Sequence, residues 1–283
     1  MAPVVFVHGV GSPPGPGADE ARSAWIDALA APAPASFDDW LRANSVLVYY
    51  QDWSWYDPDA DAERHAESAW SAMRRAIDEV VDEAHAAYDE VKPQRFADLA
   101  ELASRWSDSD RVATAGNIAA DRVSAFNLWQ VPAFFDDRDG TRRIVLDRFA
   151  AAVGDDTRVV VAHSMGSIVA FEAIHETGLE LDALVTLGSP LGVEGYVRRR
   201  LSAPDRMPPT VRRWINVSHP NEPVALVNEL APLFAPAADQ AGLEDLVLDT
   251  NAPWHGIDTY LRHDDVRRAV WTELEALVTA SSG

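Results

Sequence analysis

The chain has 283 residues, with 24 basic and 45 acidic side chains and a formal net charge of −21. Hydrophobic residues make up 47% and charged residues 24%, values that are typical of a globular domain and exclude intrinsic disorder. So acidic a chain would be repelled by nucleic acid, because neutralising phosphates takes clustered Lys and Arg. The chain contains no cysteine, which excludes disulfides, cysteine-ligated metals and a cysteine nucleophile.

The apolar segments do not indicate a membrane anchor or a secretory signal. The chain enters an apolar run at Val4 without a basic segment before it, and no apolar stretch approaches the 18 residues of a spanning helix. We therefore expect a cytoplasmic protein with no stable membrane insertion. The sequence leaves the oligomeric state open.

The first 52 residues follow a strand, helix, strand pattern. Residues 4–7 are β-branched or aromatic and end at His8-Gly9, which is typical of a buried strand. A loop rich in Gly and Pro follows, and apolar residues then recur at helical spacing, namely Ala21, Trp25, Ala28 and Leu29. Residues 45–50 predict a second strand.

Residues 53–140 have a different pattern, in which apolar side chains recur every three or four positions. This spacing predicts a helical insertion, which we interpret as a cap or lid. From residue 141 strands and helices alternate again, with helices expected at 142–153, 167–176 and 264–279 and strands at 158–161, 183–187, 213–217 and 243–248. Such alternation predicts an α/β fold with a mostly parallel sheet flanked by helices.

The strongest chemical signal is a serine between a predicted strand and a predicted helix, in Ala162-His163-Ser164-Met165-Gly166. A sharp strand-to-helix turn needs small residues two positions before and after the serine, because larger side chains would collide with neighbouring elements. Ala162 and Gly166 meet this requirement. We therefore predict Ser164 as a nucleophile at the C-terminal edge of the sheet.

A second signal follows the first strand, in His8-Gly9-Val10-Gly11. The oxygen of an acyl group becomes negative when the carbonyl is attacked, and backbone N–H donors stabilise it. We predict the N–H groups of Val10 and Met165 as an oxyanion hole. His8 and His163 are interpreted as structural members of the two motifs.

Together these residues resemble the α/β-hydrolase superfamily, in particular small bacterial lipases and esterases with an Ala-His-Ser-Met-Gly nucleophile elbow. The resemblance covers a core of residues 1–52 and 141–283, and implies that the leading strands of the full fold are absent. The segment 53–140 lies outside it. In this family the acid follows the serine and the histidine follows the acid, which directs the search downstream.

The resemblance implies Glu222 as the triad acid and His255 as the base. Glu222 stands in Asn221-Glu222-Pro223-Val224 after a predicted strand, and His255 lies in the loop before the last helix. Asp249 is an alternative acid, and His263 and His219 are alternative bases. Trp53, Trp55 and Trp254 follow predicted strands on the ligand-binding side, so they could line an acyl pocket or simply pack.

Two further patterns are explained without a ligand. Gly9-x-Gly11 lacks the remaining spacing of a dinucleotide fingerprint. Asp57-x-Asp59-x-Asp61 resembles the opening of an EF-hand, but Ala62 replaces the required Gly. We therefore expect no cofactor and no metal.

These residues predict acyl transfer through a serine nucleophile. The resemblance implies the finer function, a serine hydrolase that cleaves carboxylic esters through an acyl-enzyme, with a small-molecule acyl ester as substrate. The same triad could serve an amidase, a thioesterase or an acyltransferase. The alternative from another class is a non-catalytic binding module on a hydrolase scaffold.

Overall fold

The computed structural model describes residues 2–9, 17–31, 33, 35–50, 130–137, 140–194, 197–220, 224–225, 227–249 and 255–281. The strands are β1 (Val4–Val7), β2 (Ser45–Val48), β3 (Val159–His163), β4 (Leu181–Leu187), β5 (Val211–Ser218) and β6 (Gly242–Val247). The helices are α1 (Ala18–Ala30), α2 (Ala35–Ala43), α7 (Gln130–Phe135), α8 (Thr141–Ala152), α9 (Met165–Thr177), α10 (Ile257–Arg262) and α11 (Asp264–Ser281). Short 3₁₀ turns, η2 (Pro190–Gly192) and η3 (Arg198–Arg200), follow β4.

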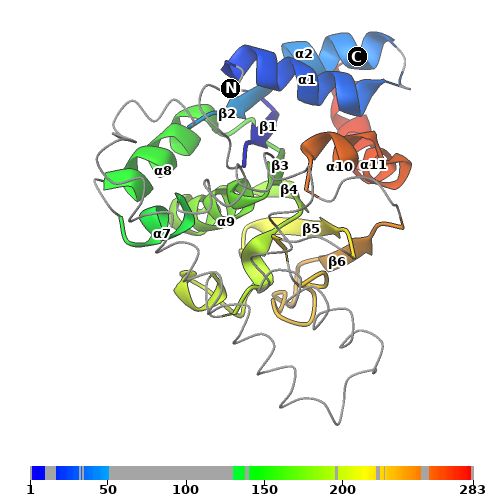
Figure 1. The fold of residues 1–283 in the computed structure, drawn as a ribbon. Coiled ribbons are helices and arrows are strands. Elements are labelled where there is room, and N and C mark those ends of the chain that lie inside the picture. The colour runs from blue at the N-terminus through cyan, green and yellow to red at the C-terminus, as the bar shows by residue number, and fades with distance from the viewer. Residues whose placement is uncertain are drawn as a thin grey trace, which may run out of the picture.

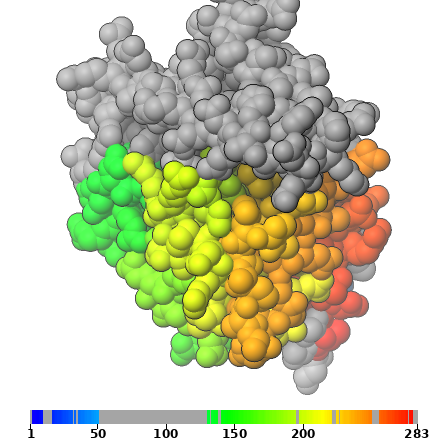
Figure 2. Space-filling model, turned by 90° about the horizontal axis from the view of Figure 1, so that it is seen from below, coloured from blue at the N-terminus to red at the C-terminus, as the bar shows by residue number. Residues whose placement is uncertain are grey.

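The six strands of the described part form one parallel sheet in the order β2-β1-β3-β4-β5-β6. The chain moves outward from β1 to β2, returns past β1 to β3, and then continues in one direction to β6. Figure 2 shows one face of the molecule, across which the surface changes from green through yellow and orange to red, in the approximate order of the chain after residue 130. The direction of winding therefore reverses between β1 and β3.

Helices cover both faces of the sheet, as Figure 1 shows. On one face α7, α8 and α9 pack against alternate strand residues such as Val5 and Val7, and on the other α1, α2, α10 and α11 pack against Val4 and Phe6. All four side chains of β1 are therefore buried. A strand covered on both faces is apolar throughout, which explains the continuous run that predicted it. The α/β class with a parallel sheet is confirmed.

The boundaries differ from the sequence prediction at several places. β3 extends to His163, so the strand ends directly before Ser164, and α9 begins directly after it at Met165. The helices α2 and α10 were not predicted. Each has nine residues or fewer, and so short a segment shows little more than two turns of apolar periodicity.

The described end of the predicted insertion belongs to the core. Val131 and Phe134 of α7 are buried in the same cluster as α8 and α9. Residues 51–129, which carry the rest of the predicted cap, lie outside the described residues. Within the ranges that the structure describes, no helix is both long enough and apolar enough to cross a membrane.

Candidate active site

Ser164 stands in a strained turn between β3 and α9. Its backbone angles are φ 53° and ψ −130°, and a positive φ is unfavourable for a residue with a side chain. The turn places α9 immediately below β1: a Cβ added to Gly166 would lie 2.4 Å from the carbonyl oxygen of Val7 and 2.6 Å from that of His8. Only glycine fits at residue 166, as expected for a nucleophile elbow.

Hydrogen bonds to the backbone of Ser164 hold this conformation. Its N–H donates to the carbonyl of Leu187 on β4 at 2.9 Å. Its carbonyl accepts from the N–H of Ser167 at 2.9 Å and from the Ser167 hydroxyl at 2.6 Å. The Ser167 hydroxyl also lies 2.7 Å from the hydroxyl of Ser189, and both side chains are buried. The elbow is therefore fixed to both β4 and α9, which offsets its strain.

The Oγ atom of Ser164 lies 2.9 Å from Nε2 of His255. For Nε2 to accept the serine proton, the proton of the neutral imidazole must be on Nδ1, and that atom is buried. Ser164 itself is only 1% exposed. A buried serine hydroxyl bonded to an imidazole is a pair that can act as nucleophile and general base.

The site lies where the winding of the sheet reverses. Val7 of β1 is the register partner of Ala162 of β3, so the loops that follow the two strands leave the sheet side by side. Open parallel sheets bind ligands at this position, beyond the carboxyl ends of the strands. Contact between the loops is close, because a Cβ added to Gly9 would lie 2.8 Å from Cβ of Ser164.

Three histidines gather at this edge of the sheet: His8, His163 and His255. The Nε2 atom of His163 lies 3.0 Å from the backbone carbonyl of His255, and the two ring centroids are 4.8 Å apart. Burial is the largest cause that lowers the pKa of His163 well below 6.5, and positive charge on His255 and His8 adds to it. Burial also lowers the pKa of His8. The neutral forms of both rings are therefore favoured.

The backbone of His8 is held by Tyr50, whose hydroxyl donates to the His8 carbonyl. Tyr50 is fully buried just after β2, and burial raises the pKa of its hydroxyl. The hydroxyl therefore keeps its proton and remains a donor. This bond anchors the start of the loop that contacts Ser164.

The other residues predicted for the site are only partly described. Met165 is the first residue of α9, where a backbone N–H has no partner within the helix. Val10, Glu222, Trp53, Trp55 and Trp254 lie outside the described residues.

The alternative acid and bases have different surroundings. Asp249 follows β6 and is exposed, a poor environment for orienting a buried ring nitrogen. His263 lies between α10 and α11, where its Nδ1 accepts from the N–H of Asp265 at 3.3 Å. It caps α11. His219 is buried directly after β5.

Asp245 of β6 is a further carboxylate near the ends of the strands, and its hydrogen bonds indicate a structural role. It accepts hydrogen bonds of 2.8 Å from the side chain of Asn216 and from the N–H groups of Leu230 and Ala231. Asn216 also donates to the carbonyl of Asn228 at 3.0 Å. These bonds attach residues 228–231 to β5 and β6.

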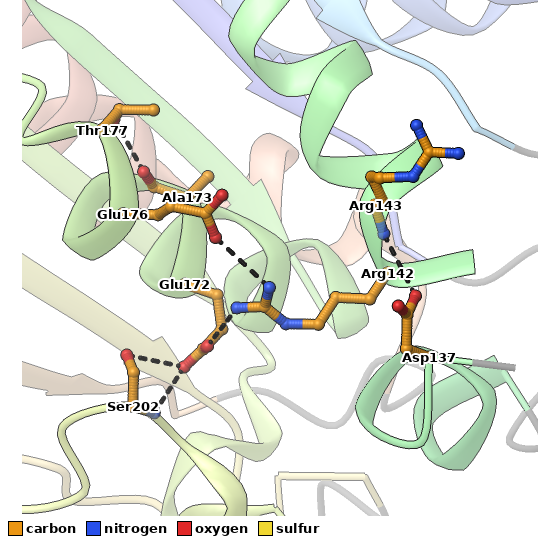
Figure 3. Close-up of polar contacts among 8 residues, drawn as sticks. All are labelled: Asp137, Arg142, Arg143, Glu172, Ala173, Glu176, Thr177 and Ser202. Atoms are coloured by element: carbon orange, nitrogen blue, oxygen red, sulfur yellow. Dashed lines mark hydrogen bonds and ion pairs between the residues drawn. The ribbon is translucent and has the colours of Figure 1, made fainter. Parts of the chain in front are cut away.

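Glu172 anchors the C-terminal half of α9 to neighbouring segments (Figure 3). This carboxylate on α9 is buried, and accepts from the N–H of Ser202 at 2.8 Å, from the Ser202 hydroxyl at 3.1 Å and from Nη2 of Arg142 at 2.9 Å. Arg142, on α8, also pairs with Glu176 at 3.2 Å. The cluster joins α8, α9 and the segment after η3, and thereby fixes the helix that begins at the elbow.

The sequence did not reveal the contacts that support the Ser164–His255 pair. The bonds of Ser167 to Ser164 and of His163 to His255, and the close approach of Gly9, were not predicted. Position 167 carried a weak signal, since a hydroxyl three residues after the serine can reach back along the first helical turn. The bond from His163 joins residues 92 apart, and no local pattern encodes such a contact.

No protein-family model, curated protein or solved structure matches this chain. Within the described ranges, no three His, Asp or Glu side chains are grouped so that they could hold a metal ion. The functional argument therefore depends on the geometry of the site.

Proposed function

We propose that this protein is a serine hydrolase of the α/β-hydrolase fold that cleaves carboxylic esters. The observation that carries the proposal is the 2.9 Å contact between Ser164 Oγ and His255 Nε2 at a strained strand-to-helix turn. The site lies at the C-terminal edge of a parallel sheet, and the serine precedes the histidine in the chain, as in this fold. The closely approaching loop after β1 supplies the second side of the site.

In the proposed reaction, Ser164 attacks the ester carbonyl and His255 takes its proton. The N–H groups of Met165 and Val10 stabilise the negative oxygen, and His255 then returns the proton to the leaving alcohol. Water, activated by His255, hydrolyses the resulting acyl-enzyme. Glu222 is proposed to accept the Nδ1 proton of His255, which fixes the tautomer and stabilises the imidazolium.

A fluorophosphonate probe tests the proposal directly, because such probes phosphonylate an activated serine. Wild-type protein should be labelled once per chain and should hydrolyse p-nitrophenyl esters. Ser164→Ala should abolish labelling and lower kcat by about six orders of magnitude. Ser36→Ala is the matched control, since Ser36 is exposed on α2 away from the site.

The result also separates the alternative functions. A non-catalytic binding module would leave wild-type protein unlabelled and inactive toward esters. Matched p-nitrophenyl ester, thioester and anilide substrates of the same acyl chain would distinguish an esterase from a thioesterase or an amidase, and added alcohols would reveal acyl transfer. Faster hydrolysis of the thioester or anilide than of the ester would overturn the proposed substrate class.

A further inference from the structure

Two consecutive residues bind the same histidine by different groups. The Oγ atom of Ser164 contacts the ring of His255, while the ring of His163 contacts its backbone carbonyl. We propose that His163 is a positioning residue, whose Nε2–H bond to the carbonyl of His255 holds the general base in register with the nucleophile. The inference rests on the proposed function, since it assigns a role relative to that base.

The ring of His163 is itself held in place, as a positioning residue requires. It is 8% exposed and packs against the rings of His255 at 4.8 Å, Tyr260 at 6.1 Å and Trp25 at 6.3 Å between centroids. On its Nδ1 side lies Gly9, where an added Cβ would approach to 3.0 Å. His163 ends β3, which pairs with β1 and β4. The ring of His163, which is the donor, is therefore held rigidly by its packing and by the central strands of the sheet.

The acceptor, in contrast, lies in a loop. His255 follows β6 and directly precedes Gly256, the N-cap of α10. Its ring position depends on the backbone of that loop, so a bond from the central strand gives the base the rigidity of the sheet. A displacement of about 1 Å in a reacting group can lower a rate about 10²-fold, which sets the scale of the contribution.

The protonation state of His163 suits this role. A carbonyl accepts only from a protonated nitrogen, so Nε2 carries the hydrogen and Nδ1 does not. The titratable rings that face His163 are His255, His8 and Tyr260. Because its pKa is lowered, His163 donates as a neutral ring. It therefore does not oppose the positive charge that His255 gains when Ser164 attacks.

Two substitutions separate positioning from packing. Gln keeps an N–H donor at nearly the reach of Nε2, whereas Met has a similar length, is apolar and has no donor. If His163 positions His255, His163→Met should lower kcat about 10- to 100-fold with little change in KM, and His163→Gln should recover most of the loss. Labelling by the fluorophosphonate should slow in the same order but reach one label per chain, which excludes an unfolded fraction as the cause. If packing alone mattered, Met would equal or exceed Gln, and that result would overturn the proposal.

A second measurement does not depend on activity. Long-range ¹H–¹⁵N NMR of wild-type protein labelled in histidine reports which ring nitrogen carries the proton, and the His163 signals are assigned by their loss in His163→Gln. We expect a neutral ring with the proton on Nε2. A proton on Nδ1 would overturn the proposal even if both variants were inactive. A wild-type protein that is not labelled by the probe, yet shows this tautomer, would refute the hydrolase function and leave the contact intact.

Discussion

Gly166→Ala is the sharpest test of the elbow, because the structure gives the collision directly. The new Cβ would lie 2.4 Å from the carbonyl oxygen of Val7, where real Cβ atoms stay at least 3.0 Å away. The start of α9 or the end of β1 would have to move by about 0.6 Å. β1 pairs with strands on both sides, so it resists this shift. We expect a loss of about 3 kcal/mol in the free energy of unfolding, near the upper end of overpacking effects.

The same shift should lower turnover, because it moves Ser164 and the N–H of Met165 relative to His255. By the scale of about 10²-fold per ångström, we expect at least about a tenfold decrease in kcat. Urea unfolding followed by tryptophan fluorescence measures stability, and initial rates with p-nitrophenyl acetate measure turnover. Gly17→Ala is the control, since nothing lies within 4 Å of its added Cβ, and it should change stability by at most about 1 kcal/mol through its N-cap position. Equal stability of the two variants would refute the steric argument.

Three further substitutions test other parts of the site. Glu172→Gln removes the charge that pairs with Arg142 and should lower the free energy of unfolding, measured by urea unfolding, by about 1–3 kcal/mol. Glu176→Gln is the control, because the side chain of Glu176 is 59% exposed, and it should change the free energy of unfolding by less than about 1 kcal/mol. Glu222→Gln should lower kcat about 10²- to 10⁴-fold with little change in KM; a rate within threefold of wild type, together with inactive Asp249→Asn, would move the acid to Asp249. Because the pKa of His163 is lowered from its ordinary value of 6.5, the unfolded chain binds a proton below pH 6.5 that the folded chain resists. The free energy of unfolding should therefore decrease as the pH is lowered below 6.5, by up to about 1.4 kcal/mol per pH unit. His163→Gln should show a shallower decrease between pH 6.5 and 5, and identical slopes would contradict this.

The sequence predicted the part of the fold that is encoded locally. Strands β1 and β3 are buried on both faces, so their continuous apolar runs were recognisable, and the small residues around Ser164 indicated the turn between β3 and α9. The helices α2 and α10 escaped prediction because their burial depends on tertiary contacts. In α10 only Tyr260 and Leu261 are buried, and two adjacent residues show no helical period.

The candidate site shows the same division between local and spatial information. Ser164 was predicted from its motif and His255 from the chain order that the family resemblance implies. The structure places Oγ of Ser164 2.9 Å from Nε2 of His255, although their catalytic roles stay a prediction. Apart from the local bond of Ser167 to Ser164, the contacts that hold them could not be predicted, because they join segments distant in the chain. His163, the buried histidine next to Ser164, was interpreted from the sequence as structural. Its partner, the carbonyl of His255, is a backbone atom that every residue type has, so no side-chain pattern identifies it.

The order of the strands explains why these distant segments meet at all. Because the winding reverses between β1 and β3, the chain leaves these neighbouring strands toward opposite sides, and the loops after them have room to approach each other. Glycine is then required at residues 9 and 166 for two separate contacts. Gly9 lets the loop after β1 approach Ser164, and Gly166 lets the start of α9 approach the end of β1. The ring of His163 reaches the loop after β6, where it contacts the carbonyl of His255. The topology brings the segments together, but the glycines and the histidine decide how closely they approach, and that distance is what the proposed chemistry depends on.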